Sequence, residues 1–163
     1  HGRGGSVHEE IPMAIRGYRC YIDRKIADLV KNLNEFATKD GRKPYNTISS
    51  CQETGRIVGR AGGGIRIGMK PLKEEDITNL NKIIEDTFSD LSIKEKEYMA
   101  KGRKRENSGM NCEVKSYSHE YSKTQFLEID CSVDRDIKGI FEKRRKDFTD
   151  NMNNSLKKLS GKL

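Results

Sequence analysis

The sequence predicts an α+β fold in which a small antiparallel sheet packs against three to four helices. Two observations lead to this prediction. Apolar residues recur at helical spacing in several long segments, whereas residues 111–133 alternate with a period of two. A glycine-rich stretch near residues 55–70 lies between two helical segments and is expected to form a second hairpin.

The first helix is expected over residues 18–38. Its apolar residues follow one helix face, and Asp40-Gly41 supplies a stop. This face comprises Ile22, Ile26, Leu29, Val30, Leu33 and Phe36. The following RKPYNTISSCQET is rich in loop-forming residues and predicts a loop, with one short strand near residues 45–49.

A second helix is predicted to begin at Pro71, because proline suits the first helical turn. Acidic residues follow at 74–76, where they favour the positive end of the helix dipole. The expected buried stripe comprises Ile77, Leu80, Ile84, Phe88 and Leu91. Ser92 and Glu95 form a capping-box pattern that predicts a short third helix, and the basic loop KGRKRENSG comes after it.

Two alternating segments, MNCEVKSYS and TQFLEIDCSV, predict antiparallel strands joined by a turn over residues 119–123. Asp134 is then expected to cap a last helix. The inward residues of that helix would be Ile137, Ile140, Phe141, Phe148, Met152, Leu156 and Leu159.

The stretch GRIVGRAGGGIRIGMK supports two compatible interpretations. In the structural one, RIVGRA and GIRIGMK are strands, Gly62-Gly63 form the tight turn, and Ile57 and Ile65 face the core. In the functional one, the glycines expose backbone N–H groups to a phosphate and the arginines neutralise it.

Part of this stretch, IVGRAGGGIR, resembles the GXXG loop of KH domains. In that family the loop clamps the backbone of single-stranded nucleic acid. The resemblance therefore implies nucleic-acid binding here. A helix should follow the loop in that family, whereas this chain continues with Gly63, Gly64, Gly68 and Pro71.

The chain has 163 residues, of which 33% are hydrophobic and 35% charged, as expected for one folded domain. The first six residues, HGRGGS, have the composition of a tag and linker, so the domain is expected over residues 7–163. Neither a membrane span nor a signal peptide is apparent. The four cysteines form no CxxC pair, which favours buried thiols in the cytoplasm or another reducing compartment, with two disulfides as the alternative. They are Cys20, Cys51, Cys112 and Cys131.

The net charge of +7 is unevenly distributed. Residues 39–70 and 101–163 are basic and residues 71–100 are acidic, so a polyanion would meet two blocks of the chain. We therefore expect a nucleic-acid-binding domain, with RNA favoured over DNA. The expected contact residues are Arg56, Gly59, Arg60, Gly62, Arg66, Lys70, Arg103, Lys104 and Arg105, with Tyr117 or Tyr121 stacking on a base.

The alternative is a nuclease, such as a toxin domain. CEVK resembles the ExK half of the PD-(D/E)xK nuclease motif, in which a carboxylate helps hold Mg²⁺ and the lysine steadies the attacking water. The candidate catalytic residues are Glu113, Lys115, Glu128 and Asp130. A metal-independent ribonuclease is also conceivable, with Lys115, Tyr117, His119 and Tyr121 as its polar groups.

A third class is a protein-interaction domain that docks partners on the acidic residues 71–100 and the basic residues 134–158. No cofactor is expected outside the nuclease alternative, which alone would need Mg²⁺. His8 and His119 are the only histidines after the first residue, which argues against a histidine-rich zinc site. No membrane partner is expected.

Overall fold

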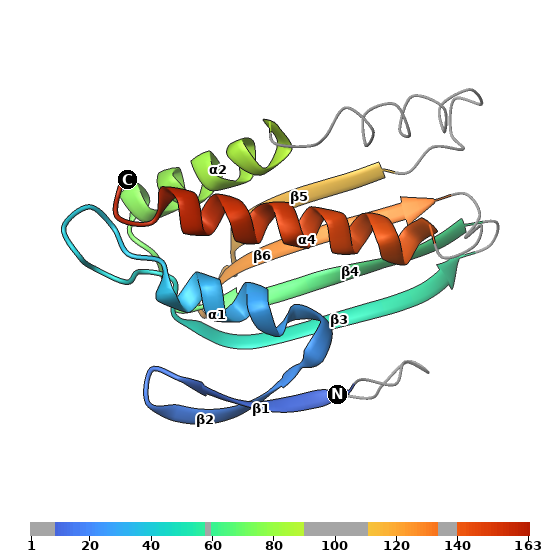
Figure 1. Cartoon of the computed structure of the whole chain (residues 1–163), viewed down its shortest axis with the longest axis horizontal. Coiled ribbons are helices and arrows are strands. Elements are labelled where there is room, and N and C mark those ends of the chain that lie inside the picture. The colour runs from blue at the N-terminus through green and yellow to red at the C-terminus, as the bar shows by residue number, and fades with distance from the viewer. Residues whose placement is uncertain (1–8, 58–59, 90–110, 134–139) are drawn as a thin grey trace.

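The computed structural model describes residues 9–57, 60–89, 111–133 and 140–163 (Figure 1). The chain is α+β, with two antiparallel sheets and three α-helices among these residues. A two-stranded ribbon is formed by β1 (Glu10–Ile15) and β2 (Tyr18–Asp23). The larger sheet has the strand order β3-β4-β6-β5.

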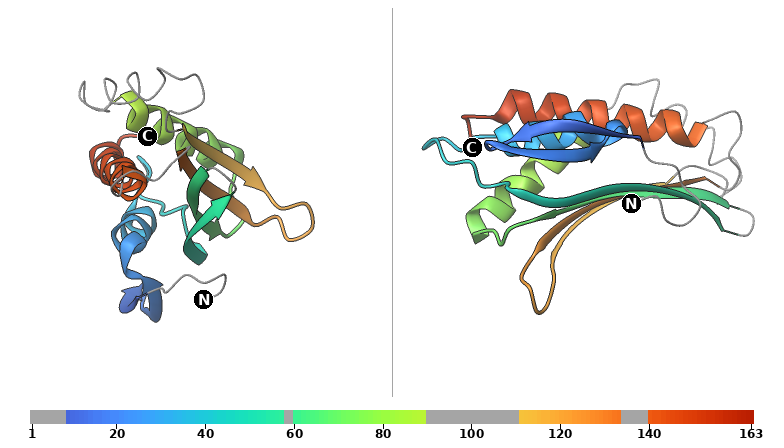
Figure 2. Two further views of the ribbon diagram at one scale, coloured as in Figure 1. Left: turned by 90° about the vertical axis from the view of Figure 1, so that its right-hand side faces the viewer. Right: turned by 90° about the horizontal axis from the view of Figure 1, so that it is seen from below.

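The described helices and the ribbon lie on one side of the larger sheet (Figure 2). The helices are α1 (Ala27–Glu35), α2 (Glu74–Ser89) and α4 (Ile140–Leu159). The core lies between the helices and the sheet, where Leu33, Leu80 and Met152 meet Ile67 and Leu127. Among the described residues, no helix is both long and apolar enough to cross a membrane.

The prediction of one helix over residues 18–38 is wrong for residues 18–26. Residues 18–23 form β2, a short 3-10 turn follows at Arg24–Ile26, and α1 begins only at Ala27. The reason is an unpredicted partner strand, β1, which pairs along the whole of β2. Arg16 and Gly17 join the two strands, with φ values of 52° and 82°. Two successive positive φ values are typical of the tight turn of a two-residue hairpin.

The glycine-rich hairpin exists, but its predicted turn at Gly62-Gly63 is wrong. Its strands are β3 (Thr47–Ile57) and β4 (Arg60–Met69), and the connecting residues 58–59 lie outside the described part. Gly62 is paired with Gly55 inside the ladder. Strand β3 also takes in most of the predicted loop. Ile65 is buried as predicted. Position 57 is paired with Arg60, which is an odd number of residues from Ile65, so positions 57 and 65 lie on opposite faces of the sheet and have opposite ladder parity.

The second hairpin is confirmed as β5 (Asn111–Ser118) and β6 (Gln125–Val133). The second helix is also confirmed, although it begins at Glu74 rather than Pro71. Phe148, Met152 and Leu156 of the last helix are buried as predicted. The predicted helix from residue 92 to about 100 and the Asp134 cap lie outside the described residues.

Candidate functional site

The larger sheet has one face against the helices and one face that none of the described helices covers (Figure 2). The alternation of side chains along β4 divides the strand between these faces. Ile65, Ile67 and Met69 are at most 1% exposed and pack towards the helices, whereas Arg66 is exposed. We call the face that carries Arg66 the open face.

Arg66 forms a cation–π contact with Phe126 on the open face, which we call the Arg66–Phe126 platform. The guanidinium carbon of Arg66 lies 4.4 Å from the centre of the Phe126 ring, a distance at which a cation is attracted to the ring face. Phe126 of β6 is itself half-buried and pairs with Gly68 of β4. The sequence placed Arg66 in the site but gave no signal for its contact with Phe126, because the two residues are 60 positions apart.

The sequence suggested that the glycines of β4 expose backbone N–H groups to a phosphate, and the structure pairs those groups within the sheet instead. Gly62 and Gly64 have the parity of Arg66, and both are paired with β3 on one side and with β6 on the other. A central strand directs its N–H groups into the two flanking ladders. These amides therefore do not face a phosphate. What the glycines supply is a pair of open-face positions without side chains.

The candidate nuclease residues fall at neighbouring positions of the β5–β6 ladder. Glu113 is directly opposite Asp130, and Lys115 is directly opposite Glu128. Glu128 is in turn paired with Arg66. All five positions have the same ladder parity, so the backbone assigns them to the open face. For the four candidate nuclease residues, the structure describes the backbone only.

Some of the remaining predicted contact residues share the open face with Arg66, and others do not. Arg60 has the ladder parity of Arg66, whereas Arg56 is paired with Ala61 and has the opposite parity. Lys70 is exposed just beyond the end of β4. Tyr117 is opposite Phe126 in the ladder, and thus at an open-face position. Gly59 and residues 103–105 lie outside the described part of the chain.

The β5–β6 hairpin ends in a well-bonded tip that bends away from the helices (Figure 2). Tyr121 is 86% exposed there, and its ring centre lies 6.1 Å from that of His119. The His119 N–H donates to the Thr124 carbonyl at 2.8 Å, and the Lys123 N–H donates to the His119 carbonyl at 3.0 Å. The tip therefore holds an exposed aromatic side chain on an ordered turn.

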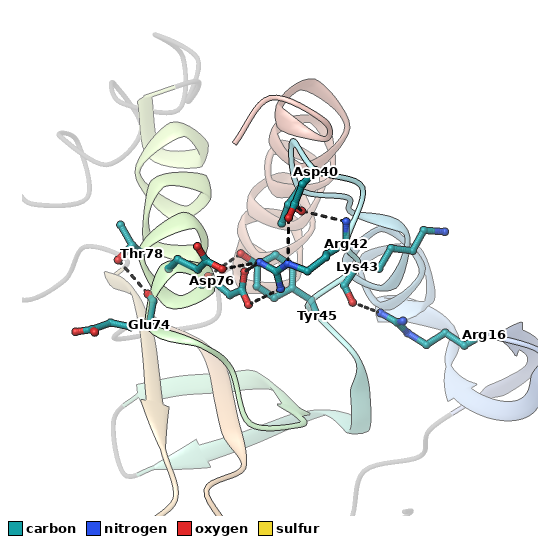
Figure 3. Close-up of polar contacts among 10 residues, drawn as sticks. Arg16, Asp40, Arg42, Lys43, Tyr45, Glu74, Asp76 and Thr78 are labelled. Atoms are coloured by element: carbon teal, nitrogen blue, oxygen red, sulfur yellow. Dashed lines mark hydrogen bonds and ion pairs between the residues drawn. The ribbon is translucent and has the colours of Figure 1, made fainter.

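A second polar cluster, which the sequence did not single out, lies at the start of α2 (Figure 3). Arg42 donates to Asp76 at 3.0 and 3.2 Å and to Glu75 at 2.9 Å, while the Tyr45 hydroxyl donates to the Asp76 carbonyl at 2.8 Å. The hydrogen bond to Asp76 raises the pKa of Arg42, and burial raises the pKa of Tyr45. The acidic first turn of α2 and the basic RK pair before Pro44 are the only sequence signals for it.

This cluster joins the loop after α1 to α2 and is structural in character. Arg16 makes a similar connection nearby, since it donates to the Lys43 carbonyl at 2.9 Å and to the side-chain oxygen of Asn34 at 3.2 Å. The acidic helix α2 thus engages Arg42, and it also engages Lys158 through Asp86. Neither cation belongs to the predicted nucleic-acid site.

Among the side chains that the structure describes, no three His, Cys, Asp or Glu residues gather closely enough to hold a metal ion. A comparison of the chain with protein families, curated proteins and solved structures found no match.

Proposed function

We propose that this protein binds single-stranded nucleic acid, RNA in preference to DNA, on the open face of its larger sheet. The observation that carries the proposal is the Arg66–Phe126 platform, which lies on the sheet face that no described helix covers. Sheet surfaces that combine aromatic rings with cations bind single strands by stacking on bases and by attracting phosphates.

The neighbouring positions support an extended ligand on this face. Gly62 and Gly64 lack side chains, so a flat group can approach the backbone of β4 closely. The exposed Lys70 adds a cation beyond the end of the same strand. The net charge of +7 favours a polyanionic partner and predicts binding that weakens as salt is added.

The open face also has acidic positions, which limit how much of the affinity can come from charge. Glu128 is the ladder partner of Arg66 and Glu53 is the ladder partner of Gly64. A double-stranded polyanion, with its dense phosphates, would be repelled more strongly than a flexible single strand. The proposal therefore favours single strands, in which bases can stack on Phe126 while phosphates stay near the cations.

The test measures the affinity of the protein for fluorescent oligouridine, oligothymidine and duplex RNA at several salt concentrations. Arg66→Gln is expected to weaken binding and to lower the slope of log affinity against log salt by about one phosphate contact. Lys82→Gln removes the same charge from an exposed position on α2 and is expected to change neither quantity. Equal effects of both variants, or no binding by the unaltered protein, would reject the proposal.

A second candidate function, a Mg²⁺-dependent nuclease, is favoured by one specific observation. The ladder register pairs Glu113 with Asp130 and Lys115 with Glu128, so two residues of β5 and two of β6 occupy neighbouring positions of the open face. Carboxylates could supply the oxygens that Mg²⁺ prefers, and the lysine could steady an attacking water.

The nuclease candidate is tested by incubating plasmid DNA and transfer RNA with the protein, with and without Mg²⁺. Cleavage that needs Mg²⁺ and is lost in Glu113→Gln would support it. Glu120→Gln, at an exposed site in the hairpin tip, is the matched control and should cleave normally. Cleavage that persists in Glu113→Gln would point to a contaminating enzyme or to other residues.

A further inference from the structure

The ladder register sets two of the four cysteines directly opposite one another. Cys112 of β5 is the register partner of Cys131 of β6, in a hairpin whose pairing continues without interruption to Ser118 and Gln125. The two residues are 19 positions apart and belong to no cysteine motif, so the pairing is visible only from the register of the hairpin. The other two cysteines are placed elsewhere, Cys20 in the ribbon and Cys51 opposite Arg66.

Directly opposed residues of an antiparallel pair fall within the range that a disulfide requires. Their Cα atoms are roughly 4.5–5.5 Å apart, and disulfides form at Cα separations of roughly 4.4–6.8 Å. The Cα separation of such a pair therefore permits a disulfide. Cys20 and Cys51 each have a non-cysteine partner in their ladders, Met13 and Arg66 respectively.

The pair also has a defined place in the fold. Position 131 has the ladder parity of Leu127, which is fully buried beneath the helices, so positions 112 and 131 belong to the covered face. They lie at the end of the hairpin far from its tip, next to the pairs Glu113–Asp130 and Asn111–Ser132. A bond there would link the two strands covalently at the end of the hairpin opposite its turn.

We propose that Cys112 and Cys131 form a cross-strand disulfide when the protein meets a disulfide oxidant such as oxidised glutathione. One cysteine thiolate attacks the glutathione disulfide and releases one glutathione thiolate, which gives a mixed disulfide. The second cysteine thiolate then attacks the protein sulfur and releases the second glutathione. The two protein thiols lose two protons and two electrons, and the oxidant accepts both electrons.

Such a bond would change the stability of the hairpin without depending on any proposed ligand. It restricts the unfolded chain by closing a loop of about 20 residues, so the oxidised protein should melt roughly 5 °C or more above the reduced protein. Reduction would return the hairpin to an unlinked state. The bond would therefore tie the hairpin, with the open-face positions 113, 115 and 117 of β5 and 126, 128 and 130 of β6, to the redox state of its surroundings.

The test treats the folded, fully reduced protein with oxidised glutathione, blocks the remaining thiols by alkylation, and maps the peptides by mass spectrometry without reduction. The expected result is one linked peptide pair that contains Cys112 and Cys131, with Cys20 and Cys51 alkylated. A Cys20→Ser, Cys51→Ser double variant should give the same linkage and the same rise in melting temperature.

Alkylation of both Cys112 and Cys131 after this treatment would overturn the proposal, and so would a linkage of either cysteine to Cys51 or Cys20. The mapping uses the unaltered protein, so the result stands even if Cys112→Ser or Cys131→Ser proves unstable. A stable Cys131→Ser variant should show no oxidant-dependent rise in melting temperature.

Discussion

The guanidinium of Arg42 contacts both carboxylate oxygens of Asp76, at 3.0 Å and 3.2 Å. Asp76 is only 2% exposed, and it lies in the first turn of α2, which packs against α4. This pair therefore fixes the loop after α1 to the start of α2. A buried carboxylate that loses its cation keeps the cost of desolvation without the compensating interaction.

We expect Arg42→Ala to lower the melting temperature by several degrees, because it leaves the Asp76 carboxylate without its charged donor. Lys43→Ala is the matched control, since it removes an adjacent exposed cation of the same loop and should leave the melting temperature within about a degree. Thermal unfolding followed by circular dichroism checks both variants. Similar melting curves for Arg42→Ala and the unaltered protein would show that the pair does not hold α2.

Asp86 on α2 and Lys158 on α4 predict a pH-dependent contribution to stability. The Lys158 ammonium lies 2.8 Å and 3.0 Å from the two carboxylate oxygens of Asp86, and this hydrogen bond lowers the pKa of Asp86. A carboxyl group whose pKa is depressed by folding stabilises the protein above its unfolded pKa of about 3.9. That stabilisation is lost as the pH falls through the lower folded value.

Asp86→Asn should accordingly reduce the melting temperature by about 1–2 °C at neutral pH, as is usual for a pair with substantial exposure. The difference from the unaltered protein should shrink below about pH 4 and vanish once Asp86 is protonated in the folded protein. Glu85→Gln, at a neighbouring exposed position, should show no such trend. A difference that is constant from neutral to acidic pH would contradict the assignment.

The placement of Gly62, Gly63 and Gly64 inside a central strand predicts slow exchange of their amide hydrogens. Each of these residues has ladder partners on both sides, in β3 and in β6. Hydrogen exchange followed by nuclear magnetic resonance should show amide protection in this stretch comparable to that at Ile65 and Ile67. A flexible loop or a phosphate-binding turn at these glycines would instead exchange its amides quickly.

Tyr121 is expected to contribute to nucleic-acid binding by stacking, if the proposed function holds. Residues 119–123 contain one acid and one lysine, so the tip adds little net charge. Tyr121→Ala should weaken binding of oligouridine about tenfold, by a factor that changes little with salt, because stacking releases no counterions.

Tyr18→Ala removes a tyrosine of similar exposure from the ribbon and is the control for the Tyr121 variant. Tyr121→Phe keeps the ring and should bind like the unaltered protein. Unchanged binding by Tyr121→Ala would show that the hairpin tip does not stack on the nucleic acid. The Arg66→Gln experiment would still test binding on the open face independently.

The sequence predicted the elements whose signals are local and missed those that depend on distant partners. Residues 111–133 alternate cleanly with a turn between the two halves, so the second hairpin was predictable. Residues 74–89 carry both a helical stripe and an acidic start, so α2 was predictable as well. Each of these segments holds its own pattern without help from the rest of the chain.

Strand β2 was missed because two periods coincide in its sequence. Ile22 and Ile26 are four residues apart and fit a helix, yet Ile22 also shares one face of a strand with Cys20, two residues before it. The choice between the two depends on β1, which is a separate segment. The Arg16-Gly17 turn was a local signal that could have indicated a hairpin.

The candidate site was predictable as a list of residue types and not as an arrangement. Glycines at positions 62 and 63 suit a tight turn when they are judged alone. In the structure they lie inside the long β3–β4 ladder, in which Ile65, Ile67 and Met69 are buried. The same pairing puts Arg66 beside Phe126 and Arg56 at the opposite parity. These relationships come from register, which the spacing within one segment does not determine.

The central claim is that single-stranded RNA lies on the open face, and nuclear magnetic resonance tests it most directly. On titration with oligouridine, the account predicts that the resonances of Arg66, Phe126 and Tyr121 shift together, while those of Leu33 and Leu156 beneath the helices stay in place. Shifts confined to the outer surfaces of α1 and α4, or no shifts at low salt, would contradict it.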